Sequence, residues 1–130
     1  MQRRVRVMLV RLGLDPRSVC AANLIFVRSR DAASSEFHRL APVCWPVHLE
    51  ILRIVQPKLI ISLGTSGLSP YGFLWDQLRP LSEQEVPSGH GDWTCRAFTA
   101  GGYTVAGIPH LGRYAIDRNP AVTGWLRGLL

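Results

Sequence analysis

The sequence lacks several features that are typical of membrane proteins, of secreted proteins and of small domains stabilised by a metal ion. No apolar run approaches the roughly 20 residues needed to span a bilayer. Arg6 and Arg11 interrupt the start of the chain, and the absence of a long apolar core there argues against a signal peptide. The three cysteines form no C-x-x-C pair, so neither a disulfide framework nor a closed zinc site is expected. These absences favour a soluble, cytoplasmic protein without a membrane partner.

Lysine is also scarce. The chain has one lysine, fourteen arginines and nine acidic residues, for a net charge of +6. A basic surface favours an anionic partner, of which nucleic acid is the commonest. Genomic base composition explains the arginine excess about as well, and the charges are scattered along the chain. With 130 residues, 47% of them hydrophobic, we expect one domain over residues 1–130, with DNA as its favoured partner.

The stretch from Pro42 to Gly64 has the pattern of one α/β unit. Pro46 is placed to open a helix, because the first helical position has no use for its N–H. Pro57 ends that helix, and the continuous apolar run Leu59–Ile61 is typical of a parallel strand covered on both faces. Ligands of open α/β sheets bind at the carboxyl ends of strands, so the residues after this run are a candidate site.

Hydrophobic periodicity predicts further elements on either side of this unit. We expect helices over residues 3–13, near 72–78 and over 119–130, strands over 18–27, 93–98 and 103–108, a polar loop over 28–42, and a turn-rich connection over 80–92. A doubly wound sheet usually begins with a strand, whereas this chain begins with a predicted helix. The sequence therefore looks like the later part of a larger α/β domain.

Two polar clusters accompany the first predicted strands. Asn23 interrupts an apolar run, where an amide must satisfy one acceptor and two donors. It could read a carbonyl beside an N–H, the pattern on a pyrimidine edge, or pair with neighbouring backbone. Gly64, Thr65 and Ser66 follow the next strand, where backbone N–H groups could cradle a phosphate. This cluster lacks the lysine of a P-loop, and a tight structural turn is the simpler explanation.

The third cluster surrounds His110, the histidine best placed for chemistry. It directly follows the predicted strand over 103–108, and Arg113 comes three residues later. An imidazole in this position could donate a hydrogen bond to a developing oxyanion. The other histidines lie in predicted loops, as His38 and His90 do, or in a predicted helix, as His48 does.

Taken in order, these segments resemble the uracil-DNA glycosylase superfamily, particularly the bacterial branches that include the iron–sulfur glycosylases. The matching stretches span residues 12 to about 125. They are Gly13-Leu14 through Val19, Ala22-Asn23-Leu24-Ile25, Cys44-x-Pro46, Gln56 to Gly64, and Pro109-His110. The resemblance implies a three-layer α/β/α sandwich with a central, mainly parallel sheet, here without its first strand.

The resemblance also implies roles for individual residues. Asn23 would hydrogen-bond a flipped base, and His110 would stabilise negative charge on the departing base. Gly64, Thr65 and Ser66 would form pocket wall or contact a phosphate. Basic residues near the predicted strand ends would supply DNA phosphate contacts: Arg28, Arg30 and Arg113.

The sequence departs from the family pattern at three places. The family's first motif, a Gly-rich loop that positions the hydrolytic water, has no match in residues 1–20, so weak activity or none is expected. The late motif normally continues with proline, whereas Leu111 follows His110. Of the family's four cluster-binding cysteines only Cys44 has a counterpart, so no iron–sulfur cluster, metal or other cofactor is expected.

Two functions follow from these observations. In the first, the chain is a uracil-DNA glycosylase-like hydrolase that extrudes a base, reads it with Asn23 and stabilises the leaving anion from His110. In the second, it is a non-enzymatic module that keeps the fold and binds nucleic acid or a protein through its basic face. A weaker third alternative is a phosphate-ligand enzyme that uses Gly64–Ser66. The sheet edge left by a missing strand would invite a second copy or another partner chain.

Overall fold

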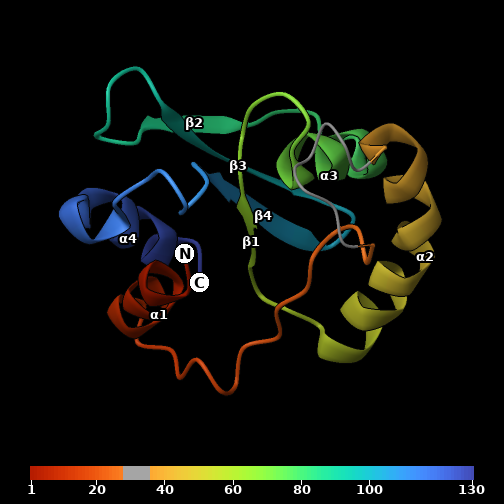
Figure 1. Ribbon diagram of the computed structural model, residues 1–130, viewed down its shortest axis with the longest axis horizontal. Helices are drawn as coiled ribbons and strands as arrows, with labels where there is room; N and C mark the ends of the chain where they lie inside the picture. The colour runs from red at the N-terminus through yellow and green to blue at the C-terminus, as the bar shows by residue number, and fades with distance from the viewer. Residues whose placement is uncertain (28–35) are drawn as a thin grey trace.

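The computed structural model describes residues 1–27 and 36–130 (Figure 1). Within these ranges, four strands form one open sheet in the order β1-β4-β3-β2. They are β1 (Ile60–Leu63), β2 (Gln84–Pro87), β3 (Thr94–Ala100) and β4 (Tyr103–Ile108). β1 and β4 are parallel, whereas the β4–β3 and β3–β2 pairs are antiparallel. The fold is therefore mixed α/β with a mostly antiparallel sheet.

Helices lie on both faces of this sheet (Figure 1). α1 (Gln2–Arg11) and α4 (Pro120–Gly128) lie on one side, and α2 (Phe37–Val55) and α3 (Pro70–Leu78) lie on the other. Side chains alternate between the two faces of a strand, so Ala106 of β4 packs with the α1 and α4 residues while Val105 packs with α3. The sheet thus separates two apolar cores.

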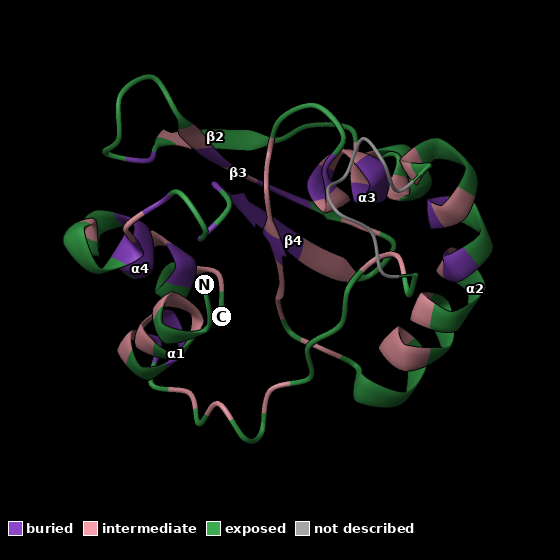
Figure 2. Ribbon diagram, in the orientation of Figure 1, coloured by how far each residue is buried: buried purple, intermediate pink, exposed green. Residues whose placement is uncertain are grey.

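Burial is uneven between the two sides (Figure 2). The core on the α1 and α4 side contains Leu111, Ile116 and Leu126, which are completely buried. α2 is much less covered, because its buried residues are only Ala41 and Cys44 while several of its apolar side chains are exposed. Most of the apolar burial that stabilises the fold therefore comes from the sheet and from the core on the α1 and α4 side. None of the helices in the described ranges has the length and apolar character needed to cross a membrane.

The predicted hairpin and the helix near residues 72–78 are confirmed. Gly101 and Gly102 join β3 to β4 with φ values of +59° and +82°. Two adjacent positive-φ positions match the twist of a two-residue hairpin, and glycine adopts them without strain. α3 begins at Pro70, after the N-cap Ser69, whose side chain accepts a hydrogen bond from the Gly72 N–H at 3.2 Å.

The strand predicted over residues 18–27 is wrong, and a mainly parallel sheet is not found among the described strands. Ser18 instead closes a turn, donating its N–H and its hydroxyl to the Asp15 carbonyl. Further along, the Leu24 carbonyl accepts a hydrogen bond from His48 of α2 at 2.9 Å. The backbone of this segment therefore forms hydrogen bonds within a turn and with a side chain of α2, rather than with a neighbouring strand. Both antiparallel pairs join strands that are consecutive in the chain, and connections as short as these cannot link parallel strands.

α2 begins earlier than the sequence predicted. The pattern placed a polar loop over 28–42 and a helix start at Pro46, but α2 starts at Phe37 and contains both Pro42 and Pro46. Each proline removes one backbone donor, yet both are exposed, so neither disturbs the packed face of the helix. Arg39 donates to the Glu36 carboxylate at 3.0 Å and adds a local contact to the first turn. The part of the predicted loop over 28–35 lies outside the described residues.

Candidate nucleic-acid interface

The carboxyl ends of β1 and β4 lie side by side. The Gly64 N–H donates to the Ile108 carbonyl at 2.7 Å, which continues the parallel pairing one residue beyond β1. Gly64 has a φ of +112°, a conformation that favours glycine, and the chain leaves the strand at this point. The cluster Gly64–Ser66 and the later His110 therefore follow adjacent strands at the same end of the sheet. The fold brings together two clusters that are far apart in the sequence.

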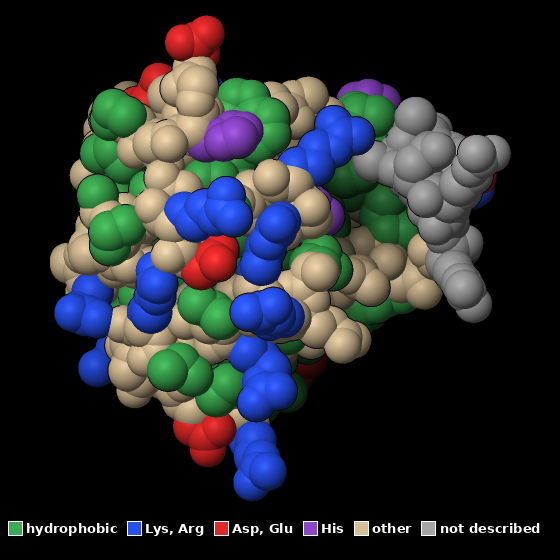
Figure 3. All heavy atoms as spheres, turned by 60° about the vertical axis from the view of Figure 1, so that its left-hand side comes forward, with side chains coloured by type: hydrophobic (Ala, Val, Ile, Leu, Met, Phe, Trp, Pro, Cys, Tyr) green, Lys and Arg blue, Asp and Glu red, His purple; other side chains and the backbone are tan. Residues whose placement is uncertain are grey.

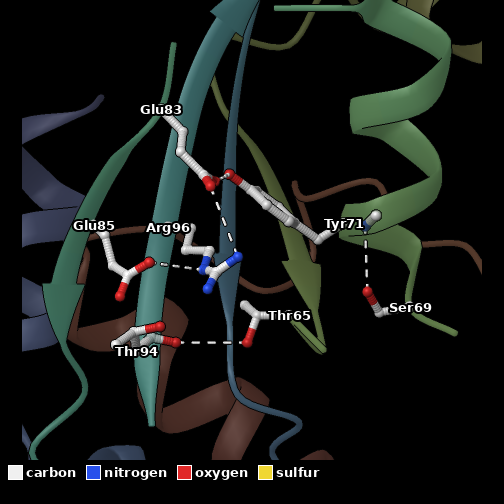
Figure 4. Close-up of polar contacts among 8 residues, drawn as sticks. Thr65, Ser69, Tyr71, Glu83, Glu85, Thr94 and Arg96 are labelled. Atoms are coloured by element: carbon white, nitrogen blue, oxygen red, sulfur yellow. Dashed lines mark hydrogen bonds and ion pairs between the residues drawn. The ribbon is translucent and has the colours of Figure 1, made fainter. Parts of the chain in front are cut away.

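The loop after β1 is packed onto the sheet at Gly107, and Figure 4 shows Thr65 of this loop beside Thr94 of β3. A Cβ atom on Gly107 would lie 2.5 Å from Tyr71 Cδ2 and 2.9 Å from Thr65 Cγ2, so only glycine allows this approach. The Thr65 hydroxyl also donates to the Thr94 carbonyl over a long distance of 3.5 Å. The position of Thr65 at the strand end is thus set by contacts with both β4 and β3.

Charged side chains pair with one another on the face of the sheet beside α3 (Figure 4). The Tyr71 hydroxyl donates to the Glu83 carboxylate at 2.8 Å. Burial raises the pKa of Tyr71, and this hydrogen bond raises it further by a smaller amount. Arg96 lies 3.7 Å from Glu83 and 3.0 Å from Glu85. Because Arg96 Nε is 3.0 Å from a Glu85 oxygen without hydrogen-bond alignment, this second contact is an ion pair only. The charge of Arg96 is therefore satisfied within the protein.

His110 is exposed at the start of the loop after β4. Its Nδ1 accepts a hydrogen bond from the Gly112 N–H at 3.1 Å. In a neutral imidazole this leaves the proton on Nε2, so the Nε2–H is the group that can donate to a ligand. The His110 carbonyl accepts from the N–H groups of Arg113 and Tyr114 at 2.9 and 3.1 Å. This tight turn keeps Arg113, which is also exposed, close to His110 along the chain.

Asn23 does not join this group. It is exposed in the segment between α1 and α2, whose Leu24 and Phe26 both contact the His48 ring of α2. Figure 1 shows this segment running from the lower end of α1 toward α2, whereas the loop after β1 arches over the top of the view. Two other predicted DNA contacts lie outside the described residues: Arg28 and Arg30.

The sequence did not reveal a basic pocket whose lining includes Arg113. The pocket has a volume of about 640 Å³ and is here called the arginine pocket. Figure 3 shows basic side chains gathered on the side of the molecule that carries α1 and α4. The Arg3-Arg4 pair was the one available signal, but the other lining residues are far away in the sequence. The charged and ring-bearing residues of the lining are Arg3, Arg4, His90, Arg113, Asp117 and Arg118.

Comparison with known proteins identifies no relative: no family model, curated protein or solved structure matches the chain. In the part of the chain that the structure describes, no three His, Cys, Asp or Glu side chains gather in a way that could hold a metal ion. The functional argument therefore depends on the strand ends, the arginine pocket and the chemistry of their side chains.

Proposed function

We propose that this chain is a uracil-DNA glycosylase-like protein that binds DNA at the carboxyl ends of β1 and β4. The parallel pairing of these strands is the observation that carries the proposal, because it places Gly64–Ser66 and His110 at one end of the sheet. In this proposal the parallel β1–β4 pair corresponds to part of the sheet of a three-layer α/β/α sandwich. A role on DNA is consistent with the cytoplasmic location expected from the sequence.

The proposed reaction is hydrolysis of the N-glycosidic bond of an extruded base. Water attacks the sugar carbon, and the base departs as an anion with the electrons of the broken C–N bond. The proton that the attacking water loses ends on this anion and gives the neutral free base. The Nε2–H of His110 donates a hydrogen bond to the base oxygen on which this negative charge develops. Gly64–Ser66 forms pocket wall or contacts a phosphate, and Arg113 contacts a phosphate. These contacts offset the few kcal/mol that base extrusion costs.

The second candidate function is nucleic-acid binding without base release. The position of Asn23 favours it, because the amide that would read the base is exposed on a segment outside the sheet. With Asn23 in this position, the strand ends lack the side chain that would distinguish one base from another. The chain would then bind nucleic acid through its basic face alone.

The test is the release of uracil from single- and double-stranded oligonucleotides that each contain one uracil, detected as alkali-cleavable strand. Because the water-positioning motif is missing, the glycosylase proposal predicts only weak release by the wild type, with a further loss of about 10²-fold or more in His110→Ala, the usual effect of removing one oxyanion donor. His38→Ala is the matched control, because His38 is an exposed histidine on α2, an element outside the sheet. This control should release uracil at the wild-type rate.

The other outcomes separate the two candidate functions. DNA binding that weakens with salt, without uracil release from either substrate, would support the binding module and exclude the glycosylase. Release that is unchanged in His110→Ala would show that His110 has no part in the reaction. A chain that neither binds nor cleaves DNA would exclude both functions.

A further inference from the structure

Hydrogen bonds hold together the three chain segments that form the arginine pocket. Arg4 Nη1 donates to the carbonyls of Leu111 and Gly112 at 2.8 and 3.1 Å, which joins α1 to the loop after β4. The buried Tyr114 hydroxyl donates to the Ser88 carbonyl at 2.6 Å, which joins this loop to the β2–β3 turn. The walls of the pocket are therefore positioned by the fold.

The positive charge of the pocket is not neutralised by the protein. Among the described residues, the ion pairs belong to Arg39, Arg53 and Arg96, and none of the four pocket arginines takes part in one. Asp117 is the sole carboxylate in the lining. The lining thus contains four arginines and one carboxylate, an excess of three positive charges. Guanidinium groups bind phosphate through paired hydrogen bonds, so phosphate is the anion that this lining favours.

An aromatic surface borders this charge. His90 lines the pocket, and its ring centroid lies 4.8 Å from that of Trp93, which is 40% exposed. Tyr114 also contacts the His90 ring edge-on, with centroids 6.4 Å apart. Proteins hold single-stranded nucleic acid by combining arginines along the backbone with aromatic rings that stack on bases. Bases in a duplex are already stacked on one another and offer no free face.

We infer that the arginine pocket binds phosphates of single-stranded DNA, with a neighbouring base stacked on the exposed ring of His90. This inference rests on the proposed DNA binding and adds a second site and a preferred strand state. Arg113 belongs both to the pocket and to the turn that follows His110, so a strand bound here continues toward the sheet end that carries His110. The volume of about 640 Å³ lies within the range of pockets that hold a small ligand, which is enough for a nucleotide unit.

The experiment measures the binding of a fluorescent oligothymidylate to the full chain by anisotropy over a series of salt concentrations. The double variant Arg3→Ala/Arg118→Ala removes two pocket charges and leaves the Arg4 hydrogen bonds intact. We expect about tenfold weaker binding or more, and a salt slope of log K that is smaller by about 0.7 for each phosphate no longer neutralised. The double variant Arg17→Ala/Lys58→Ala is the control, because it removes the same charge from exposed positions outside the pocket. It should bind within about twofold of the wild type.

His90→Ala separates stacking from charge, and it should weaken single-strand binding without a change in salt slope. Circular dichroism of each variant confirms that the fold is retained. Equal losses of affinity in the two double variants would overturn the pocket as a specific site, and duplex binding as tight as single-strand binding would overturn the stacking. If the wild type binds DNA and the pocket variant binds equally well, the inference fails and the proposed function stands. If the wild type binds no DNA, both fail.

Discussion

Gly107 lies near the carboxyl end of β4, in register with Ser62 of β1 and Arg96 of β3. Because it has no side chain, Tyr71 and Thr65 pack directly against the backbone of β4. Glycine normally weakens a strand, and this close approach explains its presence in β4. The same contact sets the position of Thr65, one of the candidate site residues.

We predict that Gly107→Ala destabilises the protein by about 1–3 kcal/mol, because the added Cβ overlaps the Tyr71 ring and forces the packed side chains to shift. Gly124→Ala is the matched control. Gly124 lies within α4 and has open space around it, so alanine should stabilise the helix by about 0.5–1 kcal/mol. The free energy of unfolding, measured by denaturant titration, should change in opposite directions in the two variants. A change in the same direction would contradict this account of Gly107.

At the scale of elements, α3 shows how local signals define a helix. Its N-cap Ser69 is buried and accepts the Gly72 N–H, and Pro70 occupies the first position, where a missing N–H costs nothing. The apolar side of the helix then packs on the sheet through Tyr71 and Leu74. These signals lie within a few residues of one another, which is why the sequence predicted this helix.

We expect Ser69→Ala to cost about 1 kcal/mol of stability, because the first turn of α3 loses its side-chain acceptor. Ser82→Ala is the comparison, since Ser82 is exposed in the connection before β2. Thermal unfolding followed by circular dichroism should show a lower midpoint for Ser69→Ala and an unchanged one for Ser82→Ala. Equal midpoints in the two variants would mean that the cap contributes nothing.

At the scale of the whole molecule, a buried thiol and two buried tyrosine hydroxyls make the free energy of unfolding depend on pH in the alkaline range. Burial raises the pKa of the Cys95 thiol from 9.0 to about 12. Burial also raises the pKa of Tyr71 and of Tyr114, with smaller effects from Glu83 on the first and from Cys95 on the second. These groups stay protonated in the folded state while their counterparts in the unfolded chain lose protons. Their contribution to stability is complete below the unfolded pKa and declines above it.

The free energy of unfolding should therefore fall as the pH rises from 9.0 toward about 12, the interval between the two Cys95 values. Cys95→Ala should show a shallower decline, because the buried thiol no longer titrates. Cys20→Ala is the control, since it removes an exposed cysteine instead of the buried one. Denaturant titrations at a series of pH values measure the slopes, and identical slopes in the three proteins would rule out the buried thiol as a cause.

The sequence by itself determined the elements whose signals are local. The Gly101-Gly102 turn, the Ser69 cap and the proline at the start of α4 each act over a few residues, so the hairpin and these helices could be predicted. The apolar run that became β1 and the position of His110 after β4 were predicted on the same basis. Of the candidate site, the sequence identified the strand-end clusters without showing that they are neighbours.

Only the tertiary structure decided which segments meet. An apolar run forms a strand only when another backbone pairs with it, and residues 18–27 have a turn and α2 beside them instead. The exposed prolines of α2 are tolerated because they lie off its packed face, which no local pattern reveals. The arginine pocket likewise depends on hydrogen bonds between remote segments, such as the bond that joins Arg4 to Leu111, 107 residues away. Such contacts form only when the chain packs around its core, because this packing brings residues from remote segments close together.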